Sequence, residues 1–127
     1  MTGPIEAVHD LSAAFARRDL AGALACFVPG DDVGYAGSEL GEAATGRAAL
    51  ASLLGEVFGR DEAYAWQVTG ATVHEYGPAA YVFTEAQGRV RTDTGDEDVF
   101  PYRVSGVVEL VEGRWLWRHC LGGEPAG

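Results

Sequence analysis

The spacing of apolar residues in the N-terminal half of the chain predicts helices. In residues 4–16, Ile5, Val8 and Phe15 recur at helical intervals, and Thr2 is placed to cap the first turn. The next stretch, RRDLAGALACF, predicts a second, short helix capped by Asp19. Both segments carry their large apolar side chains on one face, so each helix is expected to pack against a common core.

A third helix is predicted for Arg47–Phe58, with Thr45 as its cap. Residues 28–45, which precede it, are rich in glycine and acidic residues and predict a loop with one short strand near Val33–Ala36. The apolar residues of the third helix match the i, i+3, i+4, i+7, i+8 pattern of a helix with one buried face: Leu50, Leu53, Leu54, Val57 and Phe58.

The second half of the chain changes to the pattern of β-strands. Aromatic and β-branched residues dominate four segments, which are residues 63–76, 79–92, 99–111 and 114–121. Turn-forming residues separate the segments, with the shortest turn at Glu112-Gly113. Helices followed by an antiparallel meander of four long strands predict an α+β fold. We expect a single domain over residues 1–122 and a flexible tail over residues 123–127.

A two-residue turn at Glu112-Gly113 would set the register of the last hairpin, pairing Val108 with Trp117 and Gly106 with His119. The face expected to pack against the helices is then aromatic and apolar: Tyr102, Val104, Gly106, Val108, Leu110, Trp115, Trp117, His119 and Leu121. The opposite face has the mixed character of a subunit interface: Arg103, Ser105, Val107, Glu109, Leu116, Arg118 and Cys120.

Composition narrows the function classes. The 127 residues are 47% hydrophobic and 22% charged, with a net charge of −10, and all nine basic residues are arginine. This acidic balance argues against nucleic acid or an anionic membrane as partner. The N-terminus has no signal-peptide pattern, which favours the cytoplasm. The two cysteines and three histidines lack metal-ligand spacing, so we expect no metal and no cofactor.

Four segments, in this order, resemble the SnoaL-like branch of the nuclear-transport-factor-2-like superfamily. FVPGDDVGY and TGRAALASLLGEVF resemble its acidic loop and third helix, and VHEYGPAAYV resembles its first long hairpin, with Pro78 at a usually acidic position. EGRWLWRHCLGG resembles its closing motif: Gly113, Trp115 and His119 match it, whereas Leu121 replaces a second histidine.

This resemblance implies a cystatin-like α+β cone, in which helices close one side of a curved antiparallel sheet and leave a pocket. It also implies a homodimer, because many members are dimers. Ketosteroid isomerases share the cone and use an acidic base with phenol and carboxylic acid donors. In this sequence Tyr35 aligns with the base and Phe15 with the phenol donor, so steroid-isomerase chemistry is disfavoured.

His119 is the catalytic candidate that remains, because imidazole exchanges protons near neutral pH. Tyr35 is its candidate phenolic partner, while a structural histidine and a packed loop tyrosine are the plainer interpretations. The pocket for a small apolar molecule is expected to be lined by aromatic side chains, each of which can equally be a core residue: Phe15, Trp66, Tyr102 and Trp117.

Three functions stay open at this point. The first is cofactor-free acid–base catalysis of the isomerase, dehydratase or cyclase type on an apolar carbonyl compound. The second is a non-catalytic, dimeric ligand-binding or accessory protein that uses the same pocket. The third is an interaction module acting through the outer sheet face. The homodimer is expected to form through that face, including Arg103, Ser105, Val107 and Arg118.

Overall fold

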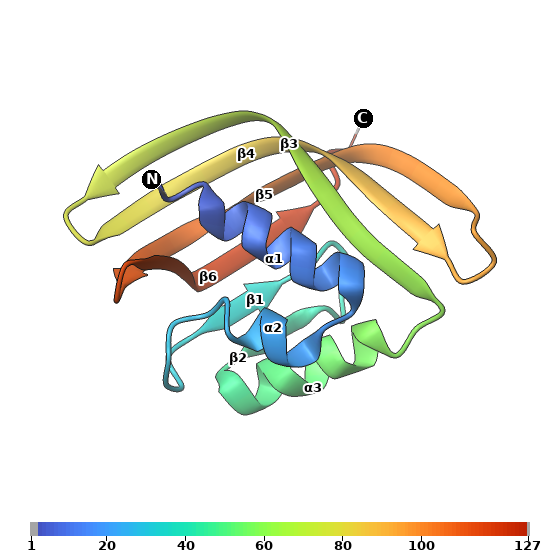
Figure 1. The fold of residues 1–127 in the computed structure, drawn as a ribbon, viewed down its shortest axis with the longest axis horizontal. Coiled ribbons are helices and arrows are strands. Elements are labelled where there is room, and N and C mark those ends of the chain that lie inside the picture. Colours follow the sequence, from blue (N-terminus) through green and yellow to red (C-terminus); the bar gives the residue numbers. More distant parts are fainter. Residues whose placement is uncertain (1–2, 127) are drawn as a thin grey trace.

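A computed structural model describes residues 3–126, in which three helices lie on the concave face of a curved sheet (Figure 1). Helices α1 and α3 span Glu6–Arg17 and Arg47–Phe58, close to the two predicted ranges, and α2 is a short helix between them. The bounds of the remaining elements are α2 Leu20–Leu24, β1 Gly34–Ala36, β2 Ala43–Thr45, β3 Glu62–Tyr76, β4 Ala79–Thr92, β5 Glu97–Val111 and β6 Arg114–Gly123.

The sheet has six strands in the order β2-β1-β6-β5-β4-β3. The four predicted long strands form the expected antiparallel meander, and the predicted short strand is β1. However, β1 pairs with β6 in parallel, so the sheet is mixed rather than purely antiparallel. The α+β class and the curvature of the sheet agree with the prediction. Strand β6 also includes Gly123, which the prediction assigned to the tail.

The helix caps agree only in part with the prediction. Asp19 caps α2 as expected, since its Oδ1 accepts from the backbone N–H of Gly22 at 3.0 Å. The Thr45 cap is wrong, because Thr45 belongs to β2 and Gly46 occupies the cap position of α3. The first N–H of α3, that of Arg47, instead donates to Asp31 Oδ1 at 2.9 Å. Thr2 lies outside the described residues.

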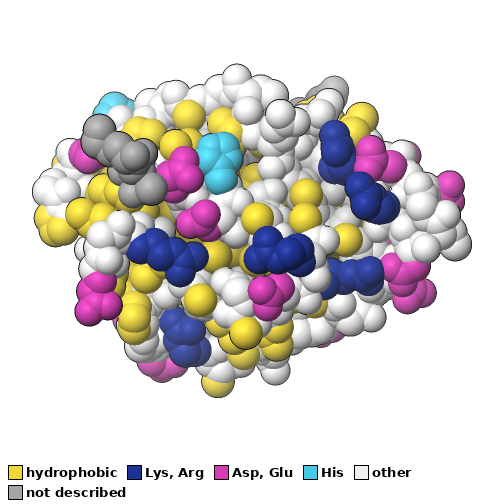
Figure 2. Space-filling model, in the orientation of Figure 1, with side chains coloured by type: hydrophobic (Ala, Val, Ile, Leu, Met, Phe, Trp, Pro, Cys, Tyr) yellow, Lys and Arg dark blue, Asp and Glu magenta, His cyan; other side chains and the backbone are white. Residues whose placement is uncertain are grey.

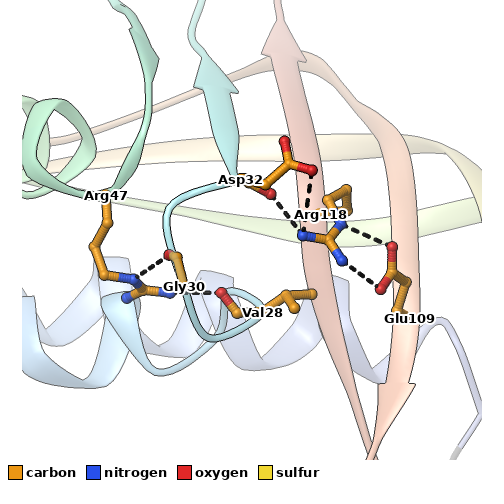
Figure 3. A network of polar contacts seen from close by, with 6 residues as sticks. All are labelled: Val28, Gly30, Asp32, Arg47, Glu109 and Arg118. Carbon is orange, nitrogen blue, oxygen red and sulfur yellow. Dashed lines mark hydrogen bonds and ion pairs between the residues drawn. The ribbon is translucent and has the colours of Figure 1, made fainter.

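Arg47 also ties the loop before β1 to the start of α3. Its Nε donates to the carbonyl oxygen of Gly30 at 2.8 Å, and its Nη2 donates to that of Val28 at 2.6 Å (Figure 3). Hydrogen bonds from a charged donor to backbone carbonyls are stronger than neutral ones. The glycine-rich segment that carries β1 is therefore held in a defined position relative to α3.

Helix α1 is attached to β3 by a buried hydroxyl. The Oγ of Ser12 donates to the carbonyl oxygen of Trp66 and accepts from its backbone N–H, both at 2.8 Å. This pair satisfies the backbone of an edge strand where the helix covers it. Because Phe15 lies one turn after Ser12, the contact also sets how Phe15 and Trp66 face each other.

The last hairpin contains the largest departure from the prediction. Its two-residue turn at Glu112-Gly113 and the Val108–Trp117 pair are as expected, but a β-bulge then places His119 opposite Val107. One extra residue reverses every later side chain of the strand. Cys120 therefore points inward and is 1% exposed. His119 and Leu121, which were predicted to face the helices, lie on the outer surface.

The outer face of β5 follows the prediction, since Arg103, Ser105 and Val107 alternate with the buried residues of that strand. Arg118 also lies on this side. Its Nε and Nη2 each donate to a carboxylate oxygen of Glu109 at 2.8 Å, and its Nη1 donates to the carbonyl oxygen of Asp32 at 2.7 Å (Figure 3). The bulge thus supplies a side chain that connects β5, β6 and the loop before β1.

Two surface properties bear on possible partners. On the face shown in Figure 2, arginine side chains are interspersed with carboxylates, and no continuous basic patch is visible there. Among residues 3–126, no helix combines the length and the apolar character needed to cross a bilayer.

Candidate functional site

A cavity of about 380 Å³ lies between the concave face of the sheet, helices α1 and α3, and the β1–β2 loop. Its volume is within the range of small-molecule sites. Aromatic side chains form much of the wall, and five carboxylates complete it together with smaller residues. The lining residues are Phe15, Tyr35, Ser38, Glu39, Glu42, Val57, Glu62, Tyr64, Ala65, Trp66, Val90, Asp98, Val99, Phe100, Tyr102 and Glu124.

The aromatic rings of the wall form a row in which each ring contacts the next. The ring centroid of Phe15 lies 5.0 Å from that of Trp66 and 6.1 Å from that of Tyr35. Tyr102 continues the row, with its centroid 5.9 Å from Trp66 and 5.9 Å from Phe100. Such distances are typical of stabilising aromatic pairs. Rings supplied by α1, β1, β3 and β5 therefore form one continuous apolar surface.

Two glycines allow these rings to lie against the strands. A Cβ atom at Gly88 would overlap the ring of Phe100, and one at Gly122 would overlap the phenol of Tyr102. Gly88 is paired with Phe100 across β4 and β5. Any larger residue at either position would push an aromatic ring toward the cavity, so the glycines keep the cavity open.

Two phenols of the wall have hydroxyl groups available to a ligand. Tyr35 is 7% exposed, and burial, followed by the charges of Tyr102, Cys120 and Glu42, raises its pKa well above the usual 10.0. Burial likewise raises the pKa of Tyr102. Within the described part of the chain, neither hydroxyl has a hydrogen-bond partner. Both phenols stay protonated at neutral pH and can donate to an acceptor in the cavity.

Glu42 lines the same cavity as these phenols, and its charge contributes to the raised pKa of both. Its side chain is 15% exposed and its Oε2 lies 3.4 Å from Nη1 of Arg60. Oε1 of the same carboxylate accepts from the backbone N–H of Glu39 at 3.1 Å. These contacts fix the position of the Glu42 side chain in the cavity lining.

Four of the six predicted site residues line this cavity: Phe15, Tyr35, Trp66 and Tyr102. Trp117 does not. It is fully buried, and its Nε1 donates to the carbonyl oxygen of Ala7 at 3.0 Å, so the prediction of a pocket wall is wrong and the residue belongs to the core.

His119 is also outside the cavity, because the bulge turns it to the outer face of β6. There it covers Gly34 of the neighbouring β1, where a Cβ atom would approach its Cδ2 to 2.6 Å. The predicted approach of His119 to Tyr35 is therefore wrong. Adjacent backbone pairs, Gly34–His119 and Tyr35–Cys120, place the two side chains on opposite faces of the sheet.

The sequence interpretation missed Glu42, Tyr64 and Phe100. Phe100 alternates with Tyr102 in a predicted strand, so the period of two could have identified it. Glu42 lies in a loop between β1 and β2 that shows no periodicity, and only the folded chain brings it to the cavity. No three histidine, cysteine or acidic side chains of residues 3–126 are grouped so as to hold a metal ion.

We expect the protein to lose stability above pH 9. Cys26 and Cys120 are free and buried, and burial raises the pKa of Cys26 from 9.0 to about 11 and that of Cys120 as well. The stabilisation is complete below pH 9.0, the pKa of an unperturbed thiol, and is lost as pH rises through the folded-state values. The unfolded chain then loses protons that the folded chain keeps.

Denaturant unfolding between pH 9.0 and 10.0, below the ordinary tyrosine pKa, measures this loss. Each cysteine should contribute up to about 1.4 kcal/mol per pH unit. The Cys26→Ala variant serves as control, since it should show a smaller slope, to which Cys120 and, near pH 10.0, the phenols of Tyr35 and Tyr102 still contribute. A free energy of unfolding that stays constant over this interval would contradict the buried state of both thiols.

Comparisons with known proteins give one family and many similar folds. The family model of the SnoaL-like domain matches residues 5–121. No curated protein sequence matches the chain. Among solved structures, a ketosteroid isomerase-like protein from Erwinia carotovora is 22% identical, with a TM-score of 0.71 and coverage of 98% of this chain and 95% of the other.

Two further structures extend the comparison. A proposed scytalone dehydratase from Novosphingobium aromaticivorans is 17% identical, with a TM-score of 0.79 and coverage of 97% and 83% of the two chains. A protein from Nostoc punctiforme with a cystatin-like fold is 16% identical, with a TM-score of 0.73 and coverage of 97% and 89%. At these identities the likeness establishes the fold.

Proposed function

This chain belongs to the SnoaL-like family, and on that premise we propose that it binds a small, mostly apolar carbonyl compound and performs cofactor-free acid–base chemistry on it. The observation that carries the proposal is the pair of protonated phenols, Tyr35 and Tyr102, without protein partners in an aromatic cavity. A carbonyl oxygen is an acceptor that both can reach from the cavity wall, and a flat apolar body fits the surrounding rings.

The chemistry that this arrangement supports is proton transfer next to the carbonyl group. The phenols donate hydrogen bonds to the carbonyl oxygen, where negative charge develops. Glu42 takes a proton from the adjacent carbon, and the electron pair of that C–H bond forms the C=C bond of an enolate. Return of the proton to a different carbon gives isomerisation, and loss of a β-hydroxyl as water gives dehydration. No redox partner is required in either case.

The test uses exchange of α-protons for deuterium in 2-acetylnaphthalene, followed by NMR in heavy water. We expect the wild-type protein to accelerate exchange, and Glu42→Gln to lower the rate by about a hundredfold or more, since a positioned base contributes at least that factor. Tyr35→Phe removes one donor and should lower the rate by roughly tenfold to a hundredfold.

His119→Ala is the matched control, because His119 lies on the outer face and should leave the exchange rate unchanged. Absence of any protein-dependent exchange, with binding intact, would refute catalysis and leave the second candidate, a ligand-binding or accessory protein. Because Trp66 lines the cavity, its fluorescence can report ligand binding in that case. Saturable quenching of tryptophan fluorescence without exchange would then establish binding alone.

The outer face of the sheet is the proposed contact surface for a second copy of the chain. Tyr81 and Val107 are cross-strand neighbours on β4 and β5, and Leu121 of β6 is paired with Ser105. All three apolar side chains are more than a third exposed. Adjacent exposed apolar residues on a sheet are typical of protein interfaces. Arg103 and Arg118 lie on the same face.

Light scattering at several concentrations tests the dimer. We expect twice the chain mass for the wild type and the mass of one chain for Val107→Asp, because a charge in an apolar contact is not compensated. Leu40→Asp, at an exposed apolar residue of the β1–β2 loop, is the control. A wild type that remains monomeric at all concentrations would overturn the proposed dimer. It would also overturn the third function, an interaction module, in the form in which the outer sheet face binds a second copy of the chain.

A further inference from the structure

The mouth of the cavity carries unbalanced negative charge. Glu39 in the β1–β2 loop, Asp98 at the start of β5 and Glu124 after β6 all line it and are exposed. Within residues 3–126 none of the three has an ion-pair partner. The arginines nearest in sequence are engaged elsewhere, since Arg103 pairs with Glu85, Arg118 pairs with Glu109, and Arg47 donates to backbone carbonyl oxygens. Three distant chain segments thus bring like charges to one opening.

No arginine or histidine is among the residues that line the cavity. Like charges that share an opening repel one another and lower its affinity for anions. An anionic ligand, such as a carboxylate or a phosphate ester, would meet this repulsion, and the nearby guanidinium of Arg60 is already paired with Glu42. The same field favours a cation. The rings of Tyr64 and Phe100, which line the cavity beside Glu62 and Asp98, add a further attraction because aromatic faces bind ammonium groups.

The buried end of the same cavity has unused hydrogen-bond donors. The hydroxyls of Tyr35, on a residue 7% exposed, and of Tyr102 belong to side chains that line the cavity, and neither hydroxyl has a partner among the described residues. A buried donor without an acceptor is costly, so it indicates a group that a ligand satisfies. The cavity therefore presents acceptors at its mouth and donors in its interior.

We infer that the ligand is an aromatic carbonyl compound that also carries a protonated amine. The inference rests on the proposed function and specifies its substrate class. The carbonyl oxygen accepts from the buried donors, the flat apolar body lies against the aromatic row, and the ammonium group lies among Glu39, Asp98 and Glu124. A metal ion does not explain these carboxylates, since the described residues contain no group of three ligands arranged to hold one.

The experiment compares three 2-acetylnaphthalenes that differ only at position 6, where they carry an aminomethyl, a methyl or a carboxylate group. Binding is followed by quenching of tryptophan fluorescence at low and high salt. At low salt we expect the aminomethyl compound to bind roughly tenfold more tightly than the methyl compound, and the carboxylate to bind weakest. High salt should bring the three affinities together, because exposed charges are screened.

The triple variant Glu39→Gln/Asp98→Asn/Glu124→Gln should lose the preference for the amine and keep its affinity for the methyl compound. Its matched control is Glu56→Gln/Glu75→Gln/Glu112→Gln, which removes three exposed carboxylates away from the cavity and should retain the preference. If both variants lost the preference for the amine equally, the preference would depend on the net charge of the protein and not on these three carboxylates. That result would overturn the inference.

The outcomes also separate the inference from the proposed function. Equal binding of the amine and methyl compounds would refute the inference that the ligand carries a protonated amine. It would not contradict the proposed binding of a carbonyl compound. Failure of all three compounds to bind refutes both. Loss of the amine preference when calcium chloride is exchanged for sodium chloride at equal ionic strength would assign the carboxylates to a metal ion and overturn the inference.

Discussion

Replacing Trp117 with alanine is expected to lower the free energy of unfolding by about 4 kcal/mol. The side chain is fully buried where α1 covers β6, and its Nε1 donates to the carbonyl oxygen of Ala7. Removing the indole leaves a large void that the surrounding core cannot fill, and it also removes the hydrogen bond. Because domains of this size are stable by about 5–15 kcal/mol, this one change should bring the protein close to unfolding.

Urea unfolding followed by circular dichroism measures the effect. Trp117→Phe is the control, since it keeps an aromatic ring and should lose only about 1–2 kcal/mol through the smaller ring and the missing N–H. The distinction also tests the corrected role of the residue. A loss below about 1 kcal/mol for the alanine variant would be typical of an exposed or ligand-contacting ring and would contradict core burial.

Gly106→Ala is expected to cost about 3 kcal/mol. The φ angle of Gly106 is 146°, a value that side chains with a Cβ rarely adopt, and the added methyl group would overlap the carbonyl oxygen of His119. Because the obstacle is backbone, it cannot be relieved by a change of rotamer. The bulge of β6 lies beside this glycine, so the strain falls on the segment that sets the faces of β6.

Gly123→Ala provides a matched control, because no atom lies within 4 Å of a Cβ built at that position. It should change the free energy of unfolding by less than about 0.5 kcal/mol. Thermal and urea unfolding of the two variants give the comparison. Equal stability of Gly106→Ala and wild type would show that the bulge tolerates a side chain at this position.

Local patterns in the sequence were sufficient for most elements. The third helix begins and ends at the predicted residues, because its five apolar positions share one face and Gly59 follows them. The turn at Glu112-Gly113 was also predicted correctly. Both residues adopt the positive φ angles of a two-residue hairpin turn, a conformation for which glycine is favoured. In each case the determining interactions lie within a few residues, so the pattern and the structure agree.

The candidate site was predictable only in part. Phe15, Tyr35, Trp66 and Tyr102 line the cavity, and each lies on an element whose inward face was recognised or implied by the family resemblance. Glu42 was not predictable, because this loop carboxylate acquires its position from Arg60, which is 18 residues away on the far side of α3 in the sequence. Asp31 likewise caps α3 from the preceding loop.

The sequence by itself determined the order of helices and strands, the α+β class and the aromatic character of the inner face. The tertiary structure decided which side of β6 each residue occupies. Side chains alternate between the two faces of a strand, so one extra residue reverses the face of every residue that follows it. The bulge at Arg118 therefore places His119 on the outer face and Cys120 on the inner face. At that bulge Gly106 of β5 lies against the carbonyl oxygen of His119 on the neighbouring strand, a contact that no periodicity within one segment reveals.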